Sequence, residues 1–168
     1  MSLSEKINAP NPVMRNNVAD YLKVATEFEL MGVGFETLDE NPNAQSLQKC
    51  YVNQATATSI ITSYQTEFPY SADMISSEKA IMALYECGRN HLTGTDAMFE
   101  YVRVDLFSPV GSGTNEFKAR LFTVSNEVSG NTGNGGDPMT LAGTLKSVGD
   151  PVLGKFSTTT KTFTADGG

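Results

Sequence analysis

The segment from Met98 to Thr164 constrains the fold most, because it reads as a series of strands separated by turn residues. In residues 98–107, Val102, Val104 and Leu106 alternate with charged and aromatic residues, and this period of two predicts a strand in a sheet with unlike faces. Further strands are predicted at 116–128, 139–148 and 155–164. Gly, Asn, Asp, Ser and Pro dominate the intervening residues and favour loops or turns at 108–115, 129–138 and 149–151.

The strand predicted at 116–128 changes its phase midway. The first apolar phase consists of Phe117, Ala119 and Leu121, and the second of Phe122, Val124 and Val128. Such a switch indicates either a bulge or a strand that is buried on both faces.

The chain before Met98 is predicted to add further strands, at 20–25, 27–38, 45–53 and 58–68. Gly32 and Gly34 interrupt the second of these, where they indicate a bulge or a close backbone approach. In the last one, Ile60, Tyr64 and Phe68 share one face, and only Ile61 breaks the polar face.

One helix is predicted at about 76–87. Its apolar stripe is formed by Ala80, Ile81, Leu84 and Tyr85. Ser76 or Ser77 would cap its start, and Gly88 would end it in the left-handed conformation. We therefore expect a mainly β protein, a β-sandwich or barrel of two packed antiparallel sheets with one flanking α-helix.

The domain organisation follows from the same patterns. Residues 1–19 have little periodicity and predict an extended arm, whereas residues 20–168 predict a single β-sandwich domain with a flexible loop at 129–138.

The charge balance is acidic and unevenly placed. The 168 residues hold 19 acids and 12 bases, for a net charge of −7, and residues 1–100 account for all of it. This balance argues against a protein that grips nucleic acid through its phosphates, which requires clustered Lys and Arg. No apolar run reaches the ~20 residues of a membrane helix, and no signal pattern opens the chain, so we expect no membrane partner and synthesis in the cytoplasm.

No chemical signature emerges from the candidate reactive residues. The glycine-rich stretch at 129–138 lacks the Lys-Ser/Thr and following helix of a phosphate-binding loop, and Asp137 lacks the spacing of a calcium loop. His91 stands alone, and Cys50 and Cys87 are expected to be buried, reduced thiols. The sequence therefore predicts no catalytic, cofactor-binding or metal-binding residue, and no enzyme.

Five carboxylates crowd one predicted strand and its turn. They are Glu27, Glu29, Glu36, Asp39 and Glu40. Two interpretations stay open: a solvated acidic edge, or a wall of negative charge that faces something that must not stick.

The end of the chain carries a family resemblance. The order of strand, strand, Gly/Asn loop and strand, followed by GDPVLGKFSTTTKTFT from Gly149 to Thr164, resembles the C-terminal half of the major tail tube proteins of long-tailed bacteriophages. The Gly-Asp-Pro-Val start and Lys-Thr-Phe-Thr end are its most specific parts. The rest of the chain is similar to that family in size and in the order of its elements.

The resemblance implies a structural virion protein that assembles with itself. Hexameric rings would stack into the phage tail tube, and DNA would pass through its acidic lumen as a non-specific passenger. Six copies would carry a formal charge of −42, six times that of one chain. Further partners implied are the tape measure protein and the tail tip and terminator proteins, and the implied location is the virion tail, assembled in the bacterial cytoplasm.

The resemblance also assigns roles to particular residues. The five carboxylates named above would face the lumen or an interface. Val13, Met14 and Val18 would belong to an arm that reaches between rings. Gly130, Asn131, Gly133 and Asp137 would belong to an inter-ring loop.

Two alternatives accompany this interpretation. The inner tube of a contractile tail or of a tailocin has the same kind of fold. A monomeric β-sandwich binding module is the alternative of another class, although the chain has no Trp to build an aromatic platform.

Overall fold

The computed structural model describes residues 11–111 and 115–167, and most of these residues form antiparallel β-strands. Nine strands make one sheet: β1 Val18–Val24, β2 Glu27–Leu30, β3 Phe35–Leu38, β6 Glu67–Asp73, β7 Met98–Pro109, β8 Glu116–Thr132, β9 Thr140–Ser147, β10 Val152–Ser157 and β11 Thr162–Ala165. A second sheet contains only β4 Ala44–Lys49 and β5 Thr58–Tyr64. The remaining elements are the helix α2 Lys79–Arg89 and the short 3₁₀ turns η1 Arg15–Asn17 and η2 Gly94–Ala97.

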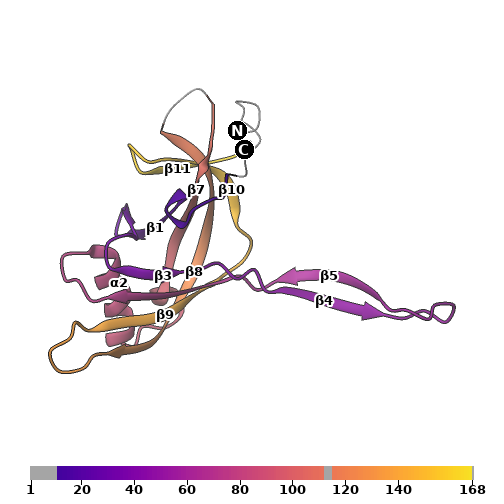
Figure 1. The fold of residues 1–168 in the computed structure, drawn as a ribbon, viewed down its shortest axis with the longest axis horizontal. Helices are drawn as coiled ribbons and strands as arrows, with labels where there is room; N and C mark the ends of the chain where they lie inside the picture. Colours follow the sequence, from indigo (N-terminus) through magenta and orange to yellow (C-terminus); the bar gives the residue numbers. More distant parts are fainter. Residues whose placement is uncertain (1–10, 112–114, 168) are drawn as a thin grey trace, which may run out of the picture.

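The large sheet is curled, so that its two edges approach each other. Its strand order is β2-β1-β7-β8-β9-β6-β3, with β10 on the first half of β8 and β11 on β10. The edge strands β2 and β3 are joined by only four residues, 31–34. Met31 N donates to Asp20 O of β1 at 2.8 Å, and Asp73 N of β6 donates to Gly34 O at 2.8 Å. The expected mainly β fold with one flanking helix is confirmed, and one continuous sheet supplies both of its walls (Figure 1).

The curled sheet encloses the main core, which the helix covers. Phe68 of β6 packs against Tyr101 of β7 and Phe122 of β8, with ring centroids 4.7 Å and 4.9 Å apart, although β6 and β7 are not neighbours in the sheet. Ile81 and Leu84 of α2 complete this core and are fully buried. Burial of each such side chain contributes on the order of 2 kcal/mol.

A second core lies on the other face of β7 and β8. Its buried members are Tyr21, Phe28, Val102, Val104, Ala119 and Phe156. The phase switch predicted in β8 is explained by these two cores: Ala119 packs in the second, and Phe122 and Val124 pack in the first. The interpretation of a strand buried on both faces is therefore confirmed, and the register shift near Val128 adds a bulge farther along.

The helix is shifted from its predicted position. It begins after Glu78, without a side-chain cap from Ser76 or Ser77, and runs to Arg89. Gly88 lies inside the helix, at a point where a Cβ would be 2.8 Å from the Cβ of Val128. The left-handed residue after the helix is His91, with φ of 51°. Gly88 thus allows the helix to pack closely against β8, and it does not end the helix.

Three predicted strands are each divided. Residues 27–38 form β2 and β3 on opposite edges of the sheet, because Gly34, with φ of 89°, turns the chain between them. Residues 155–164 contribute to the hairpin β10–β11, which turns near Lys161, with φ of 52°. Residues 58–68 contain β5 and the start of β6, which lie in different sheets. Alternation alone does not reveal these reversals. In residues 58–68 the period of two continues through the reversal, and the break at Gly32 and Gly34 fits a bulge as well as a turn.

Two further expectations are settled by burial and helix length. Cys87 is buried in the core as expected, whereas Cys50 is exposed, so its predicted burial is wrong. Among the described residues, no helix is long and apolar enough to span a membrane.

Gly143 of β9 offers a sharp test of the packing inside the curled sheet. A Cβ at this position would lie 2.5 Å from Glu127 O and 2.6 Å from the Tyr70 hydroxyl, which donates to Asn126 Oδ1 at 2.8 Å. We expect Gly143→Ala to lower the free energy of unfolding by about 1–3 kcal/mol, measured by urea denaturation, because the site is already full.

The matched control is Gly135→Ala, since nothing lies within 4 Å of a Cβ built there. This variant is expected to stay within about 0.5 kcal/mol of the parent protein. Equal unfolding midpoints for both variants would contradict this account of Gly143.

Candidate functional site

The hairpin β4–β5 is the most conspicuous surface feature of the molecule. It projects from the body as a long two-stranded ribbon, seen at the right of Figure 1. All residues of both strands are exposed. An isolated two-stranded hairpin is only marginally stable in water, so this ribbon has little reason to be retained for the fold of one subunit.

The hairpin carries apolar side chains that the subunit does not bury. Leu47, Ile60, Ile61 and Tyr64 are 46%, 51%, 57% and 62% exposed. Leu47 and Ile60 are direct cross-strand partners and therefore share one face of the ribbon, whereas Ile61 pairs with Ser46 on the other face. Exposed apolar side chains on a projecting element are a feature of interaction sites.

The charge of this region differs from that of the body. Residues 41–66 contain no carboxylate, and Lys49 is their one charged residue. The other residues therefore carry a formal charge of −8 against −7 for the whole chain. A ribbon without carboxylates can approach an acidic copy of the same chain without electrostatic repulsion.

The root of the hairpin is held by backbone and side-chain hydrogen bonds. Asn41 and Glu67 exchange backbone hydrogen bonds of 2.9 Å and 3.0 Å. Asn43 adopts a left-handed φ of 49°, and its Nδ2 donates to Gln65 O at 3.1 Å and to Glu67 Oε1 at 3.0 Å. These contacts join the ribbon to β6 and fix its starting point.

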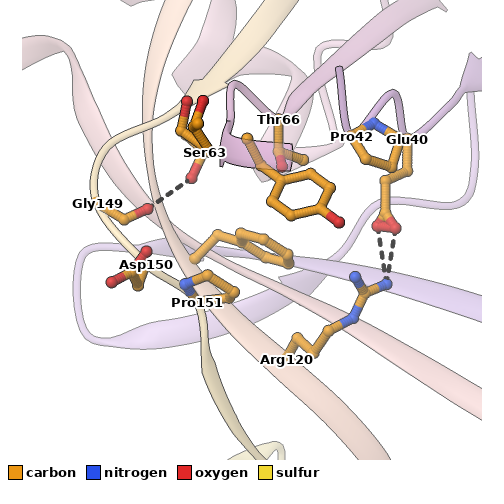
Figure 2. Close-up of a pocket in the computed structure, with 12 residues that line it drawn as sticks. Glu40, Pro42, Ser63, Thr66, Arg120, Gly149, Asp150 and Pro151 are labelled. Atoms are coloured by element: carbon orange, nitrogen blue, oxygen red, sulfur yellow. Dashed lines mark hydrogen bonds and ion pairs between the residues drawn. The ribbon is translucent and has the colours of Figure 1, made fainter. Parts of the chain in front are cut away.

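A pocket lies beside this root, between the hairpin and the turn that follows β9 (Figure 2). Its most prominent contact is the ion pair of Glu40 and Arg120, in which one guanidinium nitrogen lies 2.9 Å from Oε1 and 2.8 Å from Oε2. Arg120 also lies over the ring of Phe122, 5.4 Å from its centroid. The pocket holds polar and aromatic side chains of mixed kind, and its ion pair ties the start of the hairpin to β8.

The five carboxylates singled out in the sequence do not form one group. Glu27 and Glu29 lie on β2, at one edge of the sheet, whereas Glu36 lies on β3 at the other edge, followed by Asp39 and Glu40. Glu29 pairs with Lys79 at 3.6 Å, and Glu40 pairs with Arg120. Glu27, Glu36 and Asp39 are exposed and, within the described residues, have no cation at ion-pair distance.

The predicted arm is shorter than expected. Residues 1–10 lie outside the described part of the chain. Val13 and Met14 are exposed, at 55% and 59%. Val18 instead belongs to β1 and pairs with Asp105 of β7, so its assignment to an arm is wrong. The strand period of β1 begins two residues before the boundary drawn from the sequence.

The loop predicted at 129–138 is also shorter. Residues 129–132 continue β8, and Gly130 and Asn131 pair with Ala142 and Leu141 of β9. Gly133 and Asp137 lie in the turn of this β8–β9 hairpin. Cross-strand hydrogen bonding thus extends into a stretch whose glycine-rich composition predicted a flexible loop.

Sequence reasoning missed the projecting hairpin. Residues 58–68 alternate as a half-buried strand does, and only Ile61 on the polar face contradicted that pattern. The near absence of charge from residues 41–66 was a second signal. In the described residues, no group of three or more His, Cys, Asp or Glu side chains could hold a metal ion.

The fold of this chain, a curled antiparallel sheet with one covering helix, is similar to that of solved tail structures. The SPP1 tail tube aligns with a TM-score of 0.62 and 14% identity over 84% of this chain and 78% of the other. A chain of the tail of an empty gene transfer agent particle, refined with C6 symmetry, aligns with a TM-score of 0.57 and 10% identity over 92% of this chain and all of the other. A chain of a native gene transfer agent virion gives 0.60 and 8% over the same shares.

These alignments define the fold of this protein as that of tail tube proteins, which confirms the fold expected from the sequence resemblance. Comparison with family models gives no match. Comparison with curated proteins also gives no match.

Because the hairpin is exposed, substitutions on it should change the stability of the monomer very little. We expect the double variant Leu47→Ser, Ile60→Ser to unfold within about 1 kcal/mol of the parent protein, because neither side chain is buried in the subunit. Thermal unfolding of the monomer followed by circular dichroism measures this. A loss of several kcal/mol would show that the hairpin packs on its own subunit.

Proposed function

We propose that this protein is the structural subunit of a phage tail tube, which assembles with itself into stacked rings. The observation that carries the proposal is a carboxylate-free hairpin that projects from a tail tube fold and leaves Leu47, Ile60 and Ile61 exposed in the described subunit. Assembly supplies what the isolated subunit lacks, a surface that covers Leu47, Ile60 and their neighbours. The C6 symmetry of the gene transfer agent tail supports six subunits in each ring.

The rest of the proposal concerns location and partners. The protein would reside in the virion tail after assembly in the bacterial cytoplasm, and would contact the tape measure protein and the tail tip and terminator proteins. DNA would pass through as a non-specific passenger. The arm before β1 and the β8–β9 turn would supply additional contacts between rings, and we assign no enzymatic role.

The proposed lumen uses the unpaired carboxylates. Glu27, Glu36 and Asp39 are exposed and lie near the two approaching edges of the curled sheet, so their charges are available to repel a polyanion. Glu29 and Glu40 contribute less, because each is neutralised by a nearby cation. Like charge on the wall and on DNA removes sticking points from a long channel.

Negative-stain electron microscopy of concentrated protein tests self-assembly. We expect tubes from the parent protein and none from the Leu47→Ser, Ile60→Ser variant. The matched control is Gln48→Ala with Ser59→Ala, a cross-strand pair on the opposite face of the ribbon, which should still form tubes. Monomers under all conditions would favour a binding module instead, and tubes from all three proteins would exclude this face of the hairpin as the contact.

Charge reversal tests the lumen. We expect Glu27→Lys with Glu36→Lys to leave tube formation intact and to slow DNA delivery in reconstituted particles, since the wall would then attract phosphate. The neutral variant Glu27→Gln with Glu36→Gln should lie between the parent and the reversed protein. Unchanged delivery would place these strands elsewhere, and loss of tubes would assign them to a subunit interface.

A further inference from the structure

The curled sheet leaves a seam between β1 and β3. The first residues of β1 lie beyond the end of β2, and Met31 N to Asp20 O is a backbone hydrogen bond that crosses from the 31–34 turn to β1. A groove follows this seam and is lined by apolar residues that include Leu30, Phe35 and Leu106. Unpaired strand edges at such a seam require another group to satisfy them.

Arg15 is the side chain that bridges the seam. Its Nη1 donates to Val18 O of β1 at 2.9 Å, and its Nη2 donates to Leu38 O of β3 at 3.0 Å. The same Nη2 lies 2.7 Å from Oδ2 of Asp20. One guanidinium therefore binds carbonyl oxygens of β1 and β3 and a carboxylate that is 1% exposed.

The acceptor Asp20 is held in place by the body of the protein. Its Oδ1 accepts a short hydrogen bond from the Tyr101 hydroxyl and lies 3.4 Å from Nη1 of Arg103. Burial and the nearby Asp20 charge raise the pKa of Tyr101 well above its ordinary value, so the phenol stays a donor. Tyr101 and Arg103 therefore support the carboxylate that Arg15 binds through contacts that do not involve Arg15.

Arg15 also lies where the chain enters the body. In the turn η1, Asn17 N donates to Met14 O at 2.9 Å, and Met14 N donates to Asn17 Oδ1 at 3.0 Å. These bonds fix the backbone of Met14 directly next to the anchored Arg15. The direction in which Met14 and Val13 leave the subunit is thus set by contacts of the turn and of one arginine.

We propose that Arg15 is a positioning residue for self-assembly, which clasps the seam and presents the exposed Val13 and Met14 to a neighbouring copy of this chain. This inference rests on the proposed tail tube function. Arg15 is about half exposed, so its loss removes little buried surface from the subunit, whereas loss of a fixed exit direction affects every contact made by the preceding residues.

Arginine is specifically suited to this position. Its planar fork presents several donors at fixed angles, which allows it to reach two carbonyl oxygens and a carboxylate together. A lysine ammonium carries the same charge but cannot reproduce that spacing. The substitution Arg15→Lys keeps the positive charge beside Asp20 but removes the simultaneous hydrogen bonds to Val18 O and Leu38 O. It therefore distinguishes the bridging role of Arg15 from simple charge compensation.

The first measurement is hydrogen exchange on the monomer. In Arg15→Lys and Arg15→Ala, we expect the amides of Met14 and Asn17 to exchange about tenfold faster, as expected when charge-assisted hydrogen bonds of this kind are lost. Amides in β7 and β8 should be unchanged. Unchanged exchange at Met14 and Asn17 in both variants would contradict the proposal that Arg15 holds this turn in place, whether or not the parent protein forms tubes.

The second measurement is the rate of tube growth at equal protein concentration, with thermal unfolding of each monomer. We expect both Arg15 variants to unfold near the parent temperature and to form tubes at least about tenfold more slowly. The matched control is Lys146→Ala, which removes an equally exposed cation from its pair with Glu127 and should assemble normally.

The outcomes separate this inference from the proposed function. Normal tube growth by Arg15→Lys would show that charge alone suffices and would overturn the positioning role. If Arg15→Ala fails to fold, Arg15→Lys decides by the same criterion. Equal slowing of the Lys146→Ala control would also overturn it, and absence of tubes from the parent protein would instead overturn the proposed function.

Discussion

The structure depends on a sheet whose two edges are joined by four residues. Residues 31–34 link β2 to β3, so the intervening strands must curl until these edges approach each other. Gly34 makes this possible: its φ is 89°, and a Cβ would lie 2.7 Å from Ile81 and 2.9 Å from Ile75. The curl brings Phe68 against Tyr101 and creates the main core that α2 covers. It also creates the seam that Arg15 bridges.

Features of the fold that depend on local pattern were predictable, and features that depend on chain reversal were not. The phase switch in residues 116–128 predicted a strand that packs in two cores. The apolar stripe beginning at Ala80 predicted the helix. The separation of β2 from β3 was not predictable, because Gly34 reads equally as a bulge or as a turn. The projecting hairpin escaped prediction because alternation reports an unlike pair of faces and does not say whether the subunit itself covers either.

For the charged residues, too, the sequence pattern does not show which side chains lie together in the fold. Adjacency in sequence suggested one acidic wall from Glu27 to Glu40, but the curl places its members on two edges, and two of the five are paired with Lys79 and Arg120. Side-chain partners from distant elements therefore decide which carboxylates keep an uncompensated charge. The complementary feature, a hairpin without carboxylates, is visible in sequence only after the hairpin is known to be exposed.

The residues of this molecule fall into two groups: buried residues that stabilise the fold, and exposed residues that contribute little to it. Buried aromatic and aliphatic residues lie within the curled sheet and under α2, and their removal would be felt throughout the fold. Leu47 and Ile60 contribute little to that core because they are about half exposed, and the same is true of Arg15. Selection for subunit stability alone would not retain a projecting ribbon with exposed Leu47, Ile60 and Ile61 in water. The physical argument for the proposed assembly is therefore the cost of leaving the apolar side chains of this ribbon exposed to water, which a neighbouring copy would remove without any change in the core.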